Sequence, residues 1–430
     1  METSLWSKVV QRALDRGILS ETTPKVFIYH LDKLQNTWKQ LFDAFPPKTL
    51  HTFALKACPV KGVLSLAFSY GFGAECASIG EVYLAKSFGC PSERIVFDSP
   101  VKTMKDLKLA LDDEIYINAD NFQELEKIQQ LLRENEEELC NKQVRVGLRI
   151  NPQIGSGLIQ ETSTASAQSK FGVPLKEKLE EIVECFQRYS FLKGIHVHVG
   201  SQGCTWELLE QGIRAGVDLL VQLRERFPER LQTLDIGGGL SADYDGVSQG
   251  ASFEEYVSRL ERVAPELFDS SLQLITEFGR RLCAKAGIFV SRVEYTKQSG
   301  NRNIVLCHIG ADNFLRPVYL PKNWKHRILV LDKQGGNKLL DGREYPMIEQ
   351  DIAGPLCFSG DIFATGRLLP RCEPGDWLVV LDSGAYTLSM YSRHTSQWVS
   401  AVYGFHENSN EPFQLLKKEE SPEELIRFWS

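Results

Sequence analysis

Closely spaced cysteines are missing from this sequence, although cysteine itself is not. The chain has 430 residues and ten cysteines, yet none of them forms a CxxC pair or another short-spaced group. Zinc sites and disulfide frameworks depend on such spacings, so the sequence favours free thiols in a reducing compartment. We therefore expect neither structural zinc nor disulfides, and we expect a cytoplasmic protein.

Long apolar runs and an excess of positive charge are missing as well. The formal net charge is −7, and charged residues interrupt the helical apolar pattern of residues 1–19 at Lys8, Arg12, Asp15 and Arg16. This start is neither a signal-peptide core nor a membrane span. An acidic chain has no overall basic surface for nucleic acid or anionic lipid. The sequence thus predicts no nucleic-acid or membrane partner and favours a protein that binds or converts a small molecule.

The chain does have a regular alternation of strand-like and helical segments. Eight short, mostly apolar runs are each followed by a helical pattern, and they lie at residues 51–56, 73–76, 95–97, 115–118, 145–150, 194–198, 233–236 and 274–277. This alternation predicts parallel βα units, and eight of them favour a (β/α)8 TIM-like barrel over residues 35–285. An open doubly wound sheet is the alternative architecture.

The last third of the chain has a different pattern. Strand-like segments without long intervening helices lie at residues 288–295, 303–310, 328–332, 377–382 and 398–405. Glycine and proline turns separate them, so we expect a mostly-β sandwich or barrel domain over residues 286–430. The early strand at 25–29 is a candidate to join it, together with the rest of residues 1–34.

Polar residues gather at the ends of several predicted barrel strands. They are Lys56, Glu75, His198, the glycines Gly237, Gly238 and Gly239, and Glu277, which is followed by Gly279 and Arg280. Taken singly, each has an ordinary structural explanation, such as a surface lysine, a hydrogen-bonded core histidine or a tight turn. Catalytic groups of (β/α)8 barrels lie at the C-terminal ends of the strands. The joint placement therefore favours one functional site.

These residue types suit a cofactor with a phosphate, an aromatic ring and an aldehyde. Backbone N–H groups of a triple glycine can cradle a phosphate, and a lysine at a strand end can form a Schiff base. Glu277 can keep a pyridine nitrogen protonated while the ring of His198 stacks on it. Together they describe pyridoxal 5′-phosphate. His196 and His198 are taken to face opposite sides of their strand, so no metal site is predicted.

Eight motifs, in order along the chain, resemble those of the fold-type III pyridoxal-phosphate decarboxylases, which include diaminopimelate decarboxylase and the ornithine and arginine decarboxylases. The motifs are ALKA at Lys56, ECASIGE from Glu75, HVHVGSQ with His198 and Ser201, DIGGGL, EFGR, LRPVY, CFSGD and GAYTLSM. The resemblance implies that Lys56 holds the cofactor as a Schiff base, with Glu75 nearby. It also implies that His198 stacks on the ring, that Glu277 pairs the ring nitrogen, and that phosphate is bound by Ser201, Gly237, Gly238, Gly239, Gly279, Arg280 and Tyr386.

The resemblance also implies a second subunit. In the family, the segment that holds Cys357 comes from the partner in a head-to-tail dimer, so we expect a homodimer with active sites at the interface. Cys357 is the family's candidate for returning a proton to Cα, which makes it a catalytic residue beside Lys56 and His198. The expected substrate-binding residues are Arg280, Arg316, Tyr319, Phe358, Asp361 and Tyr386.

Phe358 departs from the family pattern, which has an acid at this position for the substrate's distal amine. Loss of that acid would cost about 1.5–3 kcal/mol of charge-assisted hydrogen bonding, of which a cation–π contact would return about 0.5–2 kcal/mol. Arg280 and Arg316 remain suited to a distal carboxylate. We therefore expect an α-decarboxylase of an amino acid with a distal carboxylate, and the substrate need not be diaminopimelate.

Other functions compete with this interpretation. They are meso-diaminopimelate decarboxylase proper, a racemase that uses the same cofactor, and a catalytically silent regulatory homologue. Racemases of this type place an arginine against the ring nitrogen, so Glu277 argues against that alternative. The polar loop at residues 155–169 is a candidate lid over the substrate.

Overall fold

The computed structural model describes residues 2–244, 246 and 250–430, and the chain divides into two compact units. The barrel unit comprises Thr37–Ala242 and Gly250–Leu282, and the sheet unit comprises Met1–Asn36, Asp243–Gln249 and Cys283–Ser430. The sheet unit therefore draws on both ends of the chain. Among the described helices, none combines the length and apolar character that crossing a membrane requires.

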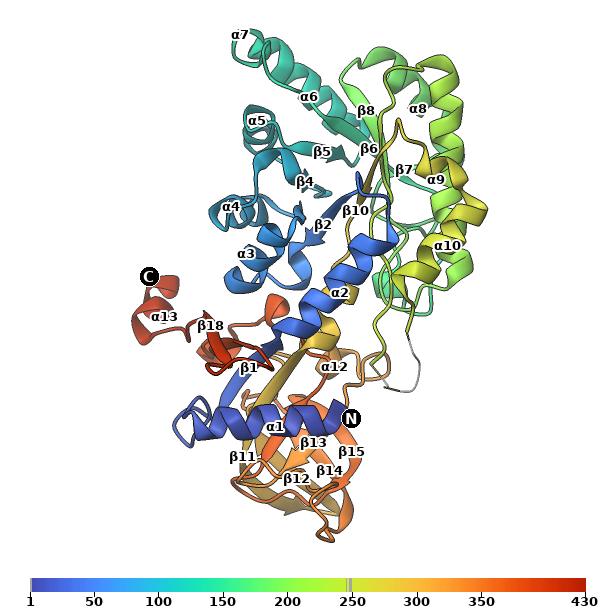
Figure 1. Ribbon diagram of the computed structural model, residues 1–430. Helices are drawn as coiled ribbons and strands as arrows, with labels where there is room; N and C mark the ends of the chain where they lie inside the picture. The colour runs from blue at the N-terminus through green and yellow to red at the C-terminus, as the bar shows by residue number, and fades with distance from the viewer. Residues whose placement is uncertain (1, 245, 247–249) are drawn as a thin grey trace. The chain divides into compact units, whose positions relative to one another are not determined.

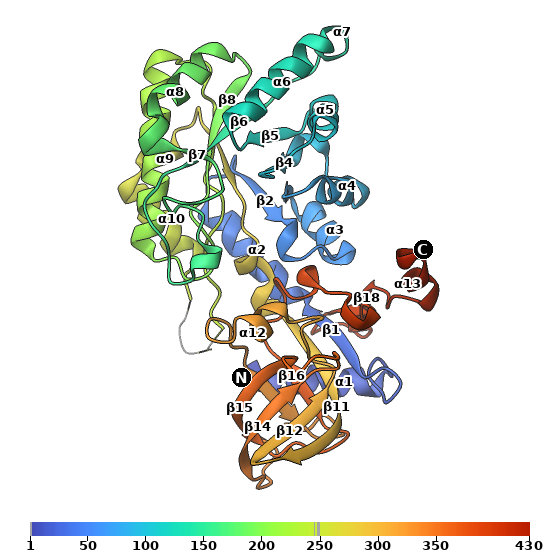
Figure 2. The same cartoon turned by 180° about the vertical axis from the view of Figure 1, so that it is seen from behind.

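Eight parallel strands form the barrel (Figures 1 and 2). They are β2 (Leu50–Ala54), β3 (Gly73–Cys76), β4 (Ile95–Phe97), β5 (Tyr116–Ala119), β6 (Val146–Asn151), β8 (Leu192–Val197), β9 (Thr233–Asp235) and β10 (Gln273–Thr276). Pairing of β5 with β6 and of β10 with β2 closes the sheet on itself, and the short β7 (Val173–Pro174) adds to β6. The predicted (β/α)8 barrel is confirmed, and the open doubly wound sheet is wrong.

Helices cover the outside of these strands, which explains why the strands read as apolar runs. The larger helices are α2 (Leu31–Ala44), α3 (Lys61–Tyr70), α4 (Ile79–Ser87), α5 (Met104–Asp112), α6 (Phe122–Glu134), α8 (Leu175–Arg188), α9 (Trp206–Arg226) and α10 (Phe253–Val263), and short turns are α7 (Glu136–Leu139) and α11 (Arg280–Cys283). Five of them begin at a residue whose side chain accepts a hydrogen bond from the first turn, namely Ser78, Thr103, Asn121, Thr205 and Ser252. These caps satisfy N–H groups that a helix start leaves unpaired.

The sheet unit contains nine strands and confirms the mostly-β prediction. They are β1 (Lys25–His30), β11 (Gly287–Ser299), β12 (Arg302–Cys307), β13 (Ile328–Leu331), β14 (Met347–Ala353), β15 (Ile362–Pro370), β16 (Trp377–Val380), β17 (Val402–Phe405) and β18 (Phe413–Lys417). β1 pairs antiparallel with β11 and parallel with β17. The sequence pattern did not predict β14, β15 or β18.

The core of the sheet unit lies between this sheet and α1 (Glu2–Asp15). Trp6, Val9 and Val10 on one face of α1 pack with Ile28 of β1 and Val290 of β11. The charged residues of α1 therefore remain on its other face, as the helical spacing predicted. Two further helices belong to this unit, α12 (Leu315–Tyr319) and α13 (Pro422–Trp429).

Candidate functional site

Lys56 lies just beyond the first barrel strand. β2 ends at Ala54, and Lys56 occupies a short 3-10 turn over Leu55–Ala57, so the predicted strand at 51–56 is two residues too long. Its Nζ lies 2.5 Å from Oε1 of Glu75, whose side chain is fully buried on β3. Burial raises the pKa of Glu75 to about 8 even though Lys56 opposes the shift. The structure thus brings together one amine and one acid that can accept its proton.

His198 lies directly after β8 and is held by the glycine loop that follows β9. The N–H of Gly238 donates to Nδ1 of His198 at 3.1 Å, so the remaining proton of a neutral ring must be on Nε2. The ring is partly open to solvent. Burial nevertheless lowers the pKa of His198 to about 3, with help from Arg149. His198 is therefore a neutral, flat ring in a fixed orientation.

The triple glycine leaves no room for side chains on this loop. An added Cβ at Gly237 would lie 2.4 Å from Nδ1 of His198, and one at Gly238 would lie 2.5 Å from the carbonyl oxygen of Glu277. Gly237 also has φ +65, a region that favours glycine. The N–H groups of Gly237 and Gly238 already donate to Oδ1 of Asp235 and Nδ1 of His198, so among the three glycines it is the N–H of Gly239 that the loop can offer to a phosphate.

Two other predicted phosphate ligands lie together in the barrel unit. Nε of Arg280 donates to Oγ of Ser201 at 3.2 Å. Gly279 precedes Arg280, and its Cβ would lie 2.9 Å from the Cβ atoms of Ala54 and Ala57, beside the turn that carries Lys56. The structure thus places the lysine, the triple glycine and the Ser201–Arg280 pair at the same end of the barrel strands.

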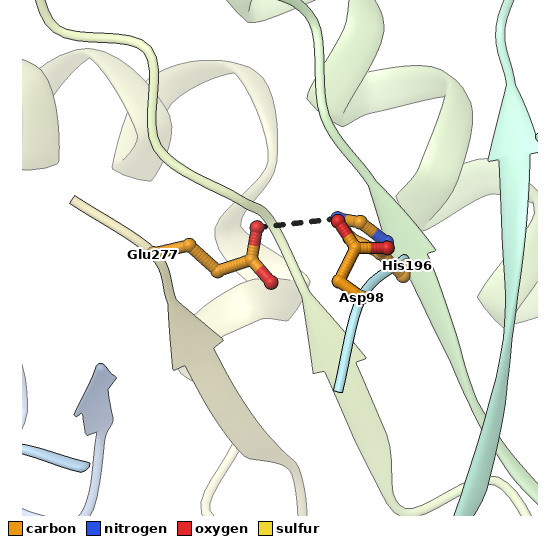
Figure 3. A group of neighbouring side chains, drawn as sticks. All are labelled: Asp98, His196 and Glu277. Atoms are coloured by element: carbon orange, nitrogen blue, oxygen red, sulfur yellow. Dashed lines mark ion pairs between the residues drawn. The ribbon is translucent and has the colours of Figure 1, made fainter. Parts of the chain in front are cut away.

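A buried ion cluster that the sequence did not predict lies next to these groups. Nδ1 of His196 is 3.4 Å from Oδ1 of Asp98, and its Nε2 is 3.4 Å from Oε2 of Glu277 (Figure 3). The guanidinium of Arg149 donates to both carboxylate oxygens of Asp98, at 2.9 and 3.1 Å. All four side chains are buried. Asp98 and Arg149 were missed because each is a single charged residue, the first directly after the apolar strand β4 and the second inside β6.

The prediction for His196 was wrong. Residues two apart on a strand point to the same side, and both His196 and His198 contact barrel groups, namely Glu277 for the first and Gly238 for the second. Asp98, His196 and Glu277 are close enough to ligate a metal ion. Arg149 already occupies both oxygens of Asp98, however, so the cluster is better described as an ion network.

Neighbouring charges outweigh burial in this network. Burial would raise the pKa of Glu277 and of Asp98. His196 outweighs it at Glu277, and Arg149 followed by His196 outweighs it at Asp98, so both pKa values are lowered. At His196 burial would lower the pKa, but Asp98 and Glu277 raise it to about 10. The imidazolium and both carboxylates are therefore charged at neutral pH.

Four of the predicted substrate residues, Arg316, Tyr319, Phe358 and Tyr386, belong to the sheet unit. The guanidinium of Arg316 on α12 lies over the rings of Trp324 and Tyr386, 4.8 and 4.7 Å from their centroids. Tyr319 stacks on Phe358, with ring centroids 6.1 Å apart and planes at 7°. These rings give the group an aromatic surface beside one cation.

Cys357 and Asp361 of the same unit differ in their surroundings. Cys357 is exposed, whereas Asp361 is buried and accepts hydrogen bonds from the N–H groups of Ala311 and Leu356, at 2.7 and 2.8 Å. The carboxylate of Asp361 therefore fixes the backbone just before Cys357 and that of the segment after β12, and a contact with substrate remains a prediction. Substrate binding by Arg316, Tyr319, Phe358 and Tyr386 also stays a prediction.

The loop at residues 155–169 is held by several hydrogen bonds within the barrel unit. The N–H of Leu158 donates to the carbonyl of Gly203 at 2.9 Å, and Oγ1 of Thr162 donates to the carbonyl of Gln202 at 2.8 Å. These bonds connect it to the segment just beyond His198 and Ser201. A lid function for the loop remains a prediction.

Comparison with known proteins gives consistent results. A family described as "Pyridoxal-dependent decarboxylase, pyridoxal binding domain" matches residues 30–284. The diaminopimelate decarboxylase of Aquifex aeolicus is 28% identical over 93% of this chain and 90% of its own length, and that of Escherichia coli strain K12 is 31% identical over 87% of each. A crystal structure of diaminopimelate decarboxylase from Helicobacter pylori, complexed with L-lysine, superposes with a TM-score of 0.83 at 27% identity, covering 97% of this chain and 99% of that one.

Proposed function

Because the chain belongs to the pyridoxal-dependent decarboxylase family, it is a pyridoxal-phosphate-dependent carboxy-lyase, and we propose that its substrate is an amino acid with a distal carboxylate. The observation that carries the proposal is Phe358, an aromatic residue stacked on Tyr319 where the family has an acid. Arg280 and Arg316 supply guanidinium groups that suit a carboxylate.

The barrel unit fits the cofactor. Within the described residues, Oε1 of Glu277 is buried and has no hydrogen-bond partner, which leaves one carboxylate oxygen for the ring nitrogen. The triple glycine has space only for backbone, as a phosphate cradle needs. When bound, pyridoxal phosphate supplies an electron sink for the electron pair left at Cα when carbon dioxide departs.

The protein's own groups prepare that step. Glu75 accepts a proton from Nζ of Lys56, which leaves the free amine that a Schiff base requires. His198, neutral and held by Gly238, would pack its flat face against the cofactor ring. Glu277 would accept a hydrogen bond from the ring nitrogen, and Ser201 with the backbone of Gly279 and Arg280 would hold the phosphate beside the glycine loop. We propose that Cys357 then returns a proton to Cα.

Assembly as a homodimer is part of the proposal. The family resemblance assigns the Cys357 segment to the partner subunit, so each site would need both chains. Mixed dimers of Lys56→Ala and Cys357→Ala chains would contain one intact site, and we expect mixing to restore decarboxylation that each variant alone lacks. A mixture as inactive as its components, under conditions in which subunits exchange, would contradict a shared site.

Substrate choice is tested by steady-state assays on a panel. It contains meso-diaminopimelate, 2-aminoadipate, glutamate and ornithine, and carbon dioxide release is measured for each. We expect a dicarboxylic amino acid without the distal amine to have the highest kcat/KM. Efficient turnover of meso-diaminopimelate alone would overturn the substrate proposal and would support diaminopimelate decarboxylase proper.

A reversed substitution gives the matched test. Phe358→Glu restores the acid, so kcat/KM for meso-diaminopimelate should rise roughly 10- to 150-fold, the equivalent of about 1.5–3 kcal/mol. Phe358→Leu removes the ring without adding charge and serves as the control. An equal gain in both variants would show that ring size, and not the missing acid, limits this substrate.

Simple measurements distinguish the two remaining alternatives, a racemase and a catalytically silent homologue. A racemase would invert Cα without releasing carbon dioxide. A silent homologue would lack turnover of the whole panel, whether or not it shows a cofactor absorption band that Lys56→Ala abolishes.

A further inference from the structure

We propose that His196 is a positioning residue that acts through Glu277, because as an imidazolium it keeps this carboxylate ionised for the ring nitrogen of the cofactor. The inference rests on the proposed function, since it assigns Glu277 to that nitrogen. His196 would touch neither substrate nor cofactor. It belongs to the interior of the barrel, on β8, with no exposed surface.

The geometry favours a charged ring, which the residues that the structure describes hold by ion-pair contacts and not by hydrogen bonds. Each nitrogen of His196 faces a carboxylate oxygen at 3.4 Å, one from Asp98 and one from Glu277 (Figure 3). A neutral imidazole has one N–H and one lone pair, so one of its nitrogens would meet an ionised carboxylate lone pair to lone pair. Only the imidazolium offers a proton to both sides.

The surrounding charges show which acid depends on His196. The cations that face this part of the barrel are Lys56, Arg149 and His196, and the acids are Glu75, Asp98, Asp235 and Glu277. Burial, followed by repulsion from Glu277, raises the pKa of Asp235 to about 8, so Asp235 is mostly neutral at pH 7. Burial likewise raises the pKa of Glu75 to about 8, and Glu75 shares its proton with Lys56, so Arg149 and His196 are the cations left for Asp98 and Glu277.

Removal of the imidazolium breaks this balance at one site. Asp98 keeps Arg149, which contacts both of its oxygens, and Glu75 keeps Lys56. At Glu277, His196 is the largest influence that lowers the pKa, and Lys56 lowers it less. A buried carboxylate without a partner takes up a proton. Glu277 would become neutral and could no longer stabilise a protonated ring nitrogen.

The direct test uses the native protein without cofactor. Histidine labelled with 15N in the ring should show that both nitrogens of His196 carry protons at pH 8, because its pKa is about 10. The His196→Gln spectrum assigns the signal. A neutral ring at pH 8 would overturn the proposal, and this outcome does not depend on whether any variant folds or any substrate is turned over.

The functional test compares His196→Gln with His51→Gln. His51 is another buried barrel histidine, but its Nδ1 faces the hydroxyl of Thr276 at 2.8 Å, so its loss removes no charge from the cluster. We expect His196→Gln to lower kcat on the order of 100-fold with little change in KM, and to add the infrared band of a protonated carboxyl group. His51→Gln should show neither effect.

A double variant distinguishes this role from general packing. In a Glu277→Gln background the carboxylate is already absent, so His196→Gln should lower kcat no further. If the two substitutions instead lower kcat by factors that multiply, the proposal is overturned. If the native protein fails to decarboxylate any panel substrate while the labelled ring is doubly protonated, the proposed function fails and the charge assignment of His196 stands.

Discussion

Replacement of Gly238 by alanine is the sharpest perturbation of the cofactor site. The new Cβ would lie 2.5 Å from the carbonyl oxygen and 3.1 Å from the carbonyl carbon of Glu277, both of which are backbone atoms. Non-bonded heavy atoms make favourable contacts at ~3.5 Å and beyond. The ends of β9 and β10 would therefore have to move apart by about 1 Å. The N–H of Glu277 donates to the carbonyl of Gly237 at 2.7 Å, and this bond would be strained by the same movement.

The expected cost follows from that overlap. Forced insertion into a packed site costs about 1–3 kcal/mol, so Gly238→Ala should lower the free energy of unfolding by about that amount. It should also raise the dissociation constant for pyridoxal phosphate roughly 5- to 150-fold, because the cradle and Glu277 move together. Denaturant unfolding followed by circular dichroism measures the first effect, and titration of the visible absorption band measures the second.

Gly80→Ala is the matched control. Gly80 is exposed on α4, and its Cβ would meet only Oγ of Ser78, at 3.6 Å. Helical glycine is less stable than alanine by about 0.5–1 kcal/mol, so this variant should be slightly more stable and should bind the cofactor as the native protein does. Native affinity in Gly238→Ala would refute the assignment of the triple glycine to the phosphate.

Two further predictions concern stability. Nζ of Lys102 is fully buried and donates to Glu124 at 2.7 Å. Lys102→Met leaves that carboxylate without its partner and should lower the free energy of unfolding by about 3–5 kcal/mol. Lys108→Met, on the surface of α5, should change the free energy of unfolding far less. Denaturant unfolding of both variants measures the contrast, and equal losses would contradict it. Burial would raise the pKa of Glu2, but Lys33 outweighs it and the pKa is lowered to about 2. A lowered folded-state pKa stabilises the fold above the unfolded value near 4.5 and stops doing so as pH falls toward 2. Glu2→Gln should therefore cost at most about 3 kcal/mol at pH 7 and nothing below pH 2, and a cost that does not vary with pH would contradict the ion pair.

The barrel, and the convergence of Lys56, His198 and Glu277 at one end of it, could be predicted because the information is local. Each parallel strand is buried on both faces, so it reads as an apolar run, and the residue that follows it projects at the barrel mouth. Lys56, His198 and Glu277 all follow this rule. The strand over 51–56 was too long only because nothing in the sequence distinguishes a strand end from the 3-10 turn that carries Lys56.

The ion network could not be predicted from the sequence. Asp98 and Arg149 are 51 positions apart, and their contact exists only because β4 and β6 line the same closed interior. The sequence pattern predicts on which side of its strand a side chain lies, but it does not predict which distant strand carries the residue that this side chain contacts. His196 carried a usable signal, since it shares a strand face with His198, but its two carboxylate partners come from other strands.

The placement of β1 between β11 and β17 has a consequence for how the chain is made. β1 leaves the ribosome before both of its neighbours, which begin at Gly287 and Val402. The apolar segment Lys25–His30 must therefore wait, unpaired on both edges, while the whole barrel sequence is synthesised. A nascent chain arrested before Val402 would expose one edge of β1, so the period before release from the ribosome is when this protein most needs a chaperone.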